Sequence, residues 1–165
     1  MKRKKAIHNV VKFLYESNAI ENVWEESALD KALIAWKYLI DEKTITLENI
    51  LKTHRLLMDG LLSEDDRGKL RRVQVWVGGR EGKPWHTLPE LMEEWIKKAN
   101  KGLKLRDGKE YFCQQMHVEF EKIHPFLDGN GRLGRMLWQK QRVDCGLPIK
   151  IIYEIEKYKY YKLFE

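Results

Sequence analysis

The 165-residue sequence is poor in cysteine and proline and has no long uninterrupted apolar run. Its two cysteines, Cys113 and Cys145, are too few for the disulfide framework of a small secreted domain, and free thiols in a reducing cytoplasm are the simpler interpretation. No segment approaches the roughly 20 apolar residues needed to span a bilayer. The basic N-terminal segment lacks an apolar core and a small-residue cleavage site, so it does not resemble a secretory signal. We therefore expect a cytoplasmic protein without a membrane partner.

The sequence also lacks a dominant charge of one sign. It has 31 basic and 25 acidic side chains, which give a net charge of +6. A basic balance is compatible with nucleic acid, an acidic membrane or a polyphosphate ligand. Here both signs are interspersed through helix-like segments, as on ordinary solvated faces. Nucleic acid is therefore not the expected partner.

No repeat, low-complexity block or Pro/Gly/Ser-rich linker divides the chain, which indicates one compact domain. Thr46 is suited to capping one helix, and Gly146 is suited to ending another. Apolar residues recur at helical spacing, the first set being Ile7, Val10, Val11 and Leu14. Helices are predicted at residues 4–20, 24–42, 46–62, 88–100, 108–123, from the glycine-rich loop to about 144, and 153–164.

The helical spacing is interrupted once. Residues 73–79, VQVWVGG, are β-branched and aromatic, end in paired glycines and are followed by REGKPWH. This pattern predicts a short strand or hairpin that stands out of a helical protein. The expected fold class is therefore mainly α, a helical bundle with a short β-hairpin.

Residues 124–135, HPFLDGNGRLGR, concentrate polar residues and glycines, and three simple interpretations of them compete. The G-x-G-x-x-G pattern inside the stretch indicates dinucleotide binding only when it follows a strand, whereas a helical pattern precedes it here. A zinc site at His117, His124 and Asp128 is disfavoured, because the histidine spacing is wrong for a helical pair and no further cysteine or histidine is near. A plain turn between helices would explain Gly-Asn-Gly alone, but not twelve such dense positions.

A phosphate site accounts for more of this stretch. Glycines in residues 128–131 allow backbone amides to point toward an anion, and the loop feeds a helix whose N-terminus favours negative charge. Arg132 and Arg135 are neighbours on one face of that helix and are suited to hold outer phosphates. Asp128 is an oxygen ligand of the kind that Mg²⁺ takes beside phosphates. His124 is suited to accept a proton from an attacking hydroxyl near neutral pH.

The stretch matches the motif H-x-F-x-(D/E)-G-N-G-R-x-x-R at every defined position, and on this basis the sequence resembles the Fic family. The resemblance extends upstream to HVEFEKIHPF and downstream through RMLWQKQRVDCGLPI and EKYKYYKLFE. The segments RGKLRRVQVWVGG and LPELMEEW are similar to the family's flap and next helix. The resemblance covers most of residues 24–165 and implies a Fic-type helical bundle with the hairpin beside the active site.

The resemblance implies protein AMPylation, in which AMP passes from ATP to a hydroxyl side chain of a target protein and pyrophosphate is released. By position, His124 would deprotonate the hydroxyl, and Asp128 would hold Mg²⁺ on the phosphates. Arg132 would contact the phosphates and Arg135 would hold the γ-phosphate, while a buried Phe126 would anchor the loop. The anion hole would be formed by Gly129, Asn130 and Gly131. The flap that aligns the target by strand pairing would lie at Val73, Gln74, Val75, Trp76 and Val77.

Three residues before or beside the motif are expected to be structural. His117 lies where the family often has a histidine, and its place on a helix face similar to that of His124 favours a structural hydrogen bond over catalysis. Met116 and Phe120 belong to the apolar stripe of their helix, so we expect them in the core rather than at adenine.

A second pattern, SNAIEN at residues 17–22, is similar to the family's inhibitory motif (S/T)-x-x-x-E-(G/N). Ser17 and Glu21 share a helix face, and Asn22 is suited to ending the helix. A Glu21 carboxylate paired with Arg135 would occupy the group meant for the γ-phosphate. We therefore expect an inhibitory N-terminal helix at residues 1–23 and a catalytic core at 24–165.

Other functions remain open at this point. Glu21 could instead orient water for removal of AMP, or another phosphate-linked group could be transferred. A nucleotide sensor or DNA-binding module is less well supported, because a pure sensor has no need of His124. A toxin with a separate antitoxin is not required, since the inhibitory pattern lies in the same chain. Self-modification and self-association are compatible with the sequence.

Overall fold

The computed structural model describes residues 2–164, and describes their side chains from residue 7 onward. Most regular structure in this part of the chain is helical, which confirms the predicted fold class. Short 3-10 turns at Trp85–Thr87, Glu154–Glu156 and Lys162–Phe164 adjoin two of the helices. The α-helices are Lys2–Ile20 (α1), Glu26–Asp41 (α2), Leu47–Leu57 (α3), Leu88–Gly102 (α4), Lys109–Ile123 (α5), Asn130–Asp144 (α6) and Lys157–Tyr161 (α7).

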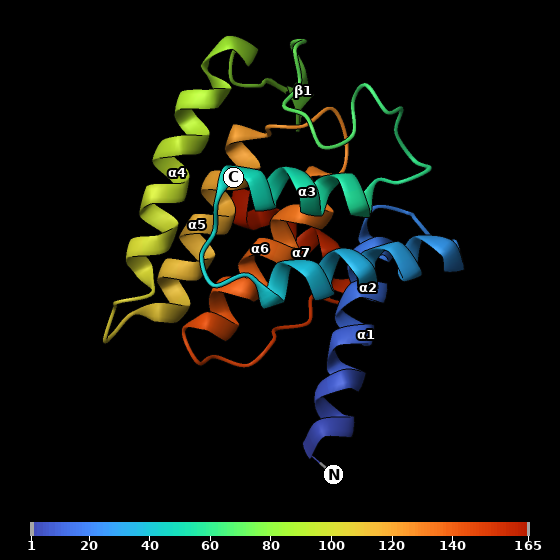
Figure 1. The fold of residues 1–165 in the computed structure, drawn as a ribbon, viewed down its shortest axis with the longest axis vertical. Helices are drawn as coiled ribbons and strands as arrows, with labels where there is room; N and C mark the ends of the chain where they lie inside the picture. The colour runs from blue at the N-terminus through green and yellow to red at the C-terminus, as the bar shows by residue number, and fades with distance from the viewer. Residues whose placement is uncertain (1, 165) are drawn as a thin grey trace.

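The helices pack around α6, which lies in the middle of the bundle (Figure 1). α5 lies beside it and α4 packs against α5, whereas α2 and α3 form a second packed pair. Twelve of the 15 residues of α6 are buried, so this helix is enclosed on nearly all sides. Polar side chains on α6 therefore lie inside the protein. None of the helices in residues 2–164 is long and apolar enough to cross a membrane.

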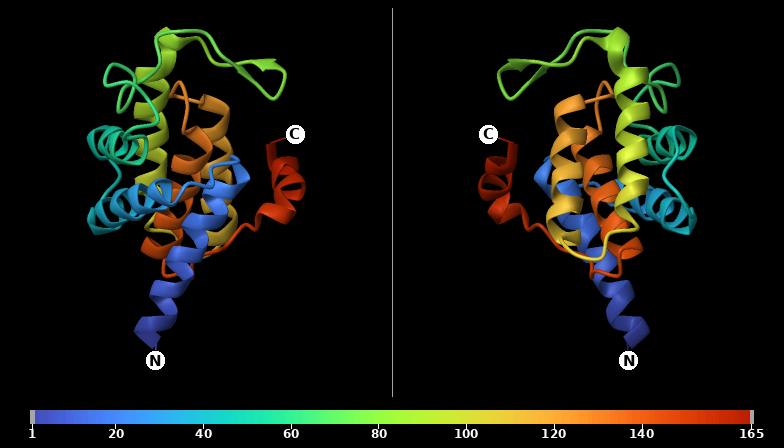
Figure 2. Two further views of the ribbon diagram at one scale, coloured as in Figure 1. Left: turned by 90° about the vertical axis from the view of Figure 1, so that its right-hand side faces the viewer. Right: turned by 90° about the vertical axis from the view of Figure 1, so that its left-hand side faces the viewer.

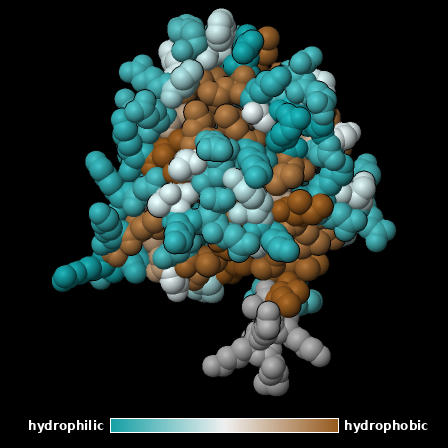
Figure 3. Space-filling view, viewed as in Figure 1, coloured by the Kyte–Doolittle hydropathy of each residue, from teal (hydrophilic) through white to brown (hydrophobic). Residues whose placement is uncertain are grey.

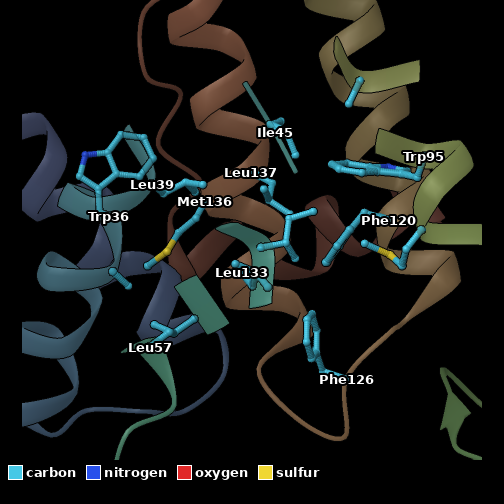
Figure 4. Close-up of a cluster of buried hydrophobic side chains, with 14 of the residues drawn as sticks. Trp36, Leu39, Ile45, Leu57, Trp95, Phe120, Phe126, Leu133, Met136 and Leu137 are labelled. Atoms are coloured by element: carbon cyan, nitrogen blue, oxygen red, sulfur yellow. The ribbon is translucent and has the colours of Figure 1, made fainter. Parts of the chain in front are cut away.

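One apolar core fills the space between α6 and its neighbours (Figure 4). Trp95 of α4 meets Phe120 of α5 edge to face, with 5.4 Å between the ring centroids. The Trp95 indole nitrogen donates to the Met116 carbonyl at 2.8 Å, which satisfies its one polar atom. Leu133 and Leu137 of α6 are fully buried in the same cluster. The predicted core positions of Met116 and Phe120 are thereby confirmed.

The first helix extends away from the bundle toward the N-terminus (Figures 1 and 2). Leu14 is fully buried and Val10 is partly buried against the core, as predicted. Ile7 is 59% exposed and Val11 is 36% exposed, so the predicted apolar stripe is wrong at these two positions. The reason is that only the second half of α1 lies among other helices, and this half carries residues 17–20.

Two predicted helix boundaries are wrong. α3 starts after Thr46, whose side chain forms the expected cap, but it ends at Leu57, five residues earlier than predicted. Gly60, at φ 74°, lies in the turn that follows. The segment predicted as one helix over 153–164 is divided into α7 and two 3-10 turns. α6 stops just before Gly146, which has φ 80° and ends the helix as predicted.

The hairpin is present but shorter than the predicted strand. Trp76–Val77 (β1) pairs antiparallel with Arg80–Glu81 (β2). Gly78 and Gly79 connect them with φ 56° and 79°, the conformation that a two-residue hairpin turn requires. Residues 73–75 precede the ladder without strand pairing. The hairpin stands out from the helices (Figure 2). The face of the protein in Figure 3 is largely hydrophilic, with apolar groups between the polar ones.

The C-terminal end of α4 gives a test of how closely the helices pack. A Cβ on Gly102 would overlap the ring of Phe112 in α5, so Gly102→Ala must displace one of them. Overpacking of this kind costs about 1–3 kcal/mol. We expect a lower urea midpoint with an unchanged m-value. The exposed neighbour variant Lys101→Ala is the control, and equal midpoints for the two variants would refute close packing here.

Candidate functional site

The motif forms the connection between α5 and α6. His124 ends α5 with φ 50°, a left-handed conformation that is uncommon for a residue with a side chain. Gly129 precedes α6 with φ 80°. Both ends of the loop therefore turn the chain sharply. Phe126 between them is fully buried, as the resemblance implied, and fixes the loop against the core.

Asn130 holds this loop in shape with its side chain. The side-chain oxygen accepts from the Phe126 amide at 2.8 Å, and the side-chain nitrogen donates to the Phe126 carbonyl at 2.8 Å. Both polar ends of Asn130 are therefore engaged inside the loop. Its contribution to an anion hole can come from its backbone amide, since Asn130 is the first residue of α6.

Arg132 supplies a buried positive charge that forms no ion pair within the described part of the chain. The side chain is 3% exposed, and its Nε and Nη1 have no hydrogen-bond partner in the described part of the chain. Its Nη2 reaches the sulfur of Met58 at 3.2 Å, a weak acceptor. An unpaired buried cation is costly, and the adjacent helix N-terminus adds positive potential. An anion bound here would be stabilised by both.

Asp128 lies at the exposed edge of the same loop. Its Oδ1 accepts from the Gly129 amide at 2.6 Å. Mg²⁺ in nucleotide sites is held by one or two carboxylates, with substrate phosphates and water completing its shell. A single exposed carboxylate next to an anion site fits that arrangement. No group of three or more candidate ligands occurs among the described residues, so a metal site built by the protein alone does not fit.

Arg135 is buried, and three residues surround its guanidinium. Nε donates to the Ser17 hydroxyl at 2.9 Å, and Nη2 donates to the Ser17 carbonyl at 2.8 Å. Nη2 also pairs with the Glu21 carboxylate at 2.7 Å. Nη1 donates to the Tyr160 hydroxyl at 3.3 Å. The structure thus brings Ser17 and Glu21 of the N-terminal pattern onto the last residue of the motif.

The Glu21 carboxylate also lies over the first turn of α6. A Cβ on Gly131 would overlap Glu21 Oε1, so the carboxylate fills the space that this glycine leaves open. Burial lowers the pKa of Arg132, while the charges of Asp128 and Glu21 act in the opposite direction. Asn22 follows with φ 58° and turns the chain after α1. Glu21 therefore places negative charge at the first turn of α6.

His124 is held in a partly buried position beside this site. Its Nδ1 has no hydrogen-bond partner among the described residues. Burial lowers the pKa of His124 below its ordinary value and Arg71 lowers it further, while the Glu121 backbone, Glu21 and Asp128 favour the charged form. The neutral imidazole is the form that can accept a proton from a hydroxyl.

The match to a known family covers more than half of the sequence. The model described as "Fic/DOC family" matches residues 44–141, which contain the motif and the hairpin. The chain belongs to the Fic/DOC family.

Individual relatives agree with this assignment. "Protein adenylyltransferase Fic" of Drosophila ananassae is 32% identical over 132 residues, which are 78% of this chain and 26% of that protein. The chain thus spans about a quarter of the length of the curated relatives that it matches. A Fic domain containing signaling protein from Bacteroides thetaiotaomicron has a TM-score of 0.82 at 18% identity, over 98% of this chain and 72% of that one. A Fic family protein from Desulfovibrio desulfuricans has a TM-score of 0.76 at 24% identity, over 95% and 56%.

His54 of α3 contacts the Fic loop, and this role was not predicted from the sequence. The Gly68 amide donates to His54 Nδ1 at 2.8 Å, so Nε2 carries the proton and donates to the Asp128 carbonyl at 2.9 Å. The imidazole stacks on Phe126 with 3.9 Å between centroids and 10° between planes. Burial lowers the pKa of His54 to about 4, which keeps it neutral in this role.

A second buried cluster lies behind Arg135. His117 Nε2 is 2.8 Å from the Tyr160 hydroxyl, so the structural hydrogen bond expected of His117 is present. Because Tyr160 accepts from Arg135, its own hydrogen is directed to His117, whose proton then sits on Nδ1, 3.9 Å from Glu121. Burial raises the pKa of Glu121 to about 7 and lowers that of His117 to about 3. With a pKa of about 7, Glu121 is partly ionised near neutral pH, so the cluster adds part of one negative charge near Arg135.

Of the predicted flap residues, Val73, Gln74 and Val75 lead into the hairpin, whereas Trp76 and Val77 form its first strand. Val73 is 51% exposed and Trp76 is 72% exposed, so both side chains are accessible to another chain. The segment is tied to the Fic motif at its base, where the Arg71 amide donates to the Pro125 carbonyl at 2.9 Å. The structure thus places the segment next to the loop that follows α5.

The neutral state of His54 predicts an acid-sensitive term in stability. An unfolded histidine has a pKa near 6.5, whereas folded His54 has a pKa of about 4. The unfolded state then binds more protons between these values, so this contribution is complete above pH 6.5 and is lost as the pH falls toward 4. Lowering the pH from 7 to 5 should remove about 2 kcal/mol through His54 alone.

Urea unfolding of wild type and His54→Gln at pH 7 and pH 5 measures this term. Glu121 titrates in the opposite sense over the same range, so the prediction concerns the difference between variants. The change in unfolding free energy with pH should be about 2 kcal/mol smaller in His54→Gln than in wild type. His86→Gln, on the exposed turn before α4, should keep the wild-type change. Identical changes in all three proteins would contradict a neutral buried His54.

Proposed function

We propose that this protein transfers AMP from ATP to a hydroxyl side chain of a target protein and releases pyrophosphate. The observation that carries the proposal is the buried guanidinium of Arg132 at the start of α6, two of whose nitrogens have no hydrogen-bond partner among the described residues, inside a complete Fic motif. Such a group needs an anion, and a nucleotide phosphate is the anion that the motif suits. The relatives named protein adenylyltransferase support the same activity.

In this reaction the hydroxyl oxygen of the target attacks the α-phosphorus of ATP. His124 takes the hydroxyl proton as the new oxygen–phosphorus bond forms. The bond between the α-phosphorus and its bridging oxygen breaks, and pyrophosphate leaves with that electron pair. The amides of residues 129–131 and the guanidinium of Arg132 stabilise negative charge on the phosphates.

The loop also has the residue needed for a metal ion. Asp128 would hold Mg²⁺ against the phosphates, and the ion would neutralise charge on the departing pyrophosphate. The role of the protein is to fix this carboxylate. The Gly129 amide holds Asp128 Oδ1, and His54 holds the Asp128 carbonyl.

We further propose that Glu21 inhibits the transfer within the same chain. Its carboxylate pairs with Arg135 and lies over Gly131, so a γ-phosphate and Glu21 would compete for one guanidinium. ATP bound without Arg135 would lack the contact that orients its α-phosphate for attack. Residues 1–23 would then form the regulatory helix, and residues 24–165 the catalytic core with the target docking at the flap.

Removal of AMP is the second candidate function, and the position of Glu21 is the observation that favours it. A carboxylate over the first turn of α6 could orient water toward a phosphate bound there. The two activities differ in what Glu21 does, since it blocks the transfer but would be required for removal. Following both the gain and the loss of AMP on one labelled protein separates them.

Glu21→Gly should raise AMP transfer, including self-modification, by roughly ten- to a hundredfold. The reason is that it removes a charge-assisted hydrogen bond worth about 1.5–3 kcal/mol and frees Arg135 for the γ-phosphate. The measurement is the initial rate of label incorporation from α-labelled ATP with Mg²⁺, into the protein itself and into lysate proteins identified by mass spectrometry. Ser17→Ala should give a smaller increase, because the Ser17 carbonyl still accepts from Arg135.

Two variants make the result interpretable. Glu26→Gly removes an exposed carboxylate outside the Arg135 cluster and should leave the rate at the wild-type level. Glu21→Gly combined with His124→Ala should abolish labelling. Equal labelling by Glu21→Gly and wild type would contradict inhibition by Glu21, whereas labelling that survives His124→Ala would contradict the assignment of the base.

A further inference from the structure

Arg71, in the segment before the hairpin, makes an unusual set of contacts. It is 4% exposed, and its guanidinium donates to three main-chain carbonyls within residues 7–164. Nε donates to the carbonyl of His124 at 2.8 Å. Nη1 donates to the carbonyl of Val73 at 2.8 Å, and Nη2 to that of Lys83 at 2.6 Å. One side chain therefore joins a residue that precedes the hairpin, a residue that follows it and the histidine of the motif.

The contacts to Val73 and Lys83 close the base of the hairpin. The ladder itself has only two residues in each strand, and so short a ladder is not stable without further support. Near the base, the Gly82 amide donates to the Val75 carbonyl at 2.8 Å. Because the Arg71 guanidinium bonds to carbonyls on both sides of the hairpin, the direction in which the hairpin leaves the bundle depends on this side chain.

The contact to His124 bears on the proposed base. The left-handed conformation of a residue with a side chain is strained and persists where neighbouring groups hold it. Arg71 holds the carbonyls of two successive peptide units, since its amide donates to the Pro125 carbonyl and its Nε to the His124 carbonyl. The imidazole direction follows from this backbone geometry.

We propose that Arg71 is a positioning residue that fixes the hairpin relative to His124, so that a hydroxyl presented by a segment docked on the hairpin meets the base. The inference rests on the proposed AMP transfer. Arg71 itself touches neither the loop amides nor Arg132 or Arg135, so its effect is on the geometry of attack rather than on nucleotide binding. Misplacement of reacting groups by about 1 Å costs on the order of a hundredfold in rate.

The charge of Arg71 adds a second, separable effect. The groups that act on His124 are the surrounding core, the backbone of Glu121, Arg71, Glu21 and Asp128. Burial and the Arg71 charge lower the pKa of His124, and the other three act in the opposite direction. Loss of the Arg71 charge should therefore raise the pKa of His124 and move the acid limb of the rate profile to higher pH.

The test uses the full chain in a Glu21→Gly background, with Arg71→Gln, Arg71→Lys and the exposed neighbour Arg72→Gln as the matched control. We expect Arg71→Gln to lower the self-modification rate at saturating ATP by about a hundredfold with an unchanged KM for ATP. Its acid limb should lie at higher pH than that of the control. Arg71→Lys keeps the charge but not the three-way fork, so it should lose rate without moving the acid limb.

Two measurements do not depend on activity. Hydrogen exchange of the amides in residues 74–83 should be faster in both Arg71 variants than in the control, and His124, followed by NMR, should titrate at higher pH in Arg71→Gln. Unfolding midpoints identify any variant that does not fold, in which case Arg71→Lys decides. Hairpin exchange and rates equal to those of Arg72→Gln would overturn the inference. If the Arg72→Gln control is not labelled while the hairpin exchange and the His124 titration change as expected, the proposed AMP transfer is wrong. The positioning role of Arg71 relative to the hairpin and His124 then stands.

Discussion

A guanidinium in the middle of a helical protein must be surrounded by acceptors, and this requirement at Arg135 connects three distant parts of the chain. Burial opposes the charge of Arg135, but Tyr160, Glu21 and Glu121 together raise its pKa above the ordinary value. Two of the acceptors, the hydroxyl and carbonyl of Ser17, are neutral and deeply buried. The Glu21 carboxylate is 36% exposed, so it is the acceptor that can leave or be replaced at least cost.

Because its buried acceptors differ from the exposed one in this way, Arg135 could serve both structure and regulation. If Glu21 moved away, Ser17 and Tyr160 would still hold the guanidinium in place, and only the position of the anion would become free. A phosphate could then supply the missing negative charge with little rearrangement. The glycine at position 131 matters for the same reason, because a side chain there would overlap the Glu21 carboxylate beside Arg135.

The fold class, most helices and the meeting of residues 17–21 with the motif could be predicted from spacing and from the family pattern. The exposure of Ile7 could not, because a helix that extends beyond its neighbours has the same spacing as one that does not. His54 left a signal, since it lies on the apolar face of α3 between buried Ile50 and Leu57. Arg71 left none, because nothing in the sequence distinguishes it from the exposed arginine beside it.

Three histidines show how the same side chain is given different tasks by its surroundings. His54 and His117 have hydrogen-bond partners that fix one tautomer each, and burial keeps both neutral. Both ring nitrogens of His54 are hydrogen-bonded. The Nδ1 of His117 has no partner among the described residues, but it is enclosed, so an incoming hydroxyl cannot reach it. His124 differs because it is only partly buried and sits at the end of a helix rather than within one. A base for an external substrate has to be both neutral and reachable, and in residues 7–164 this combination occurs next to the anion site at His124.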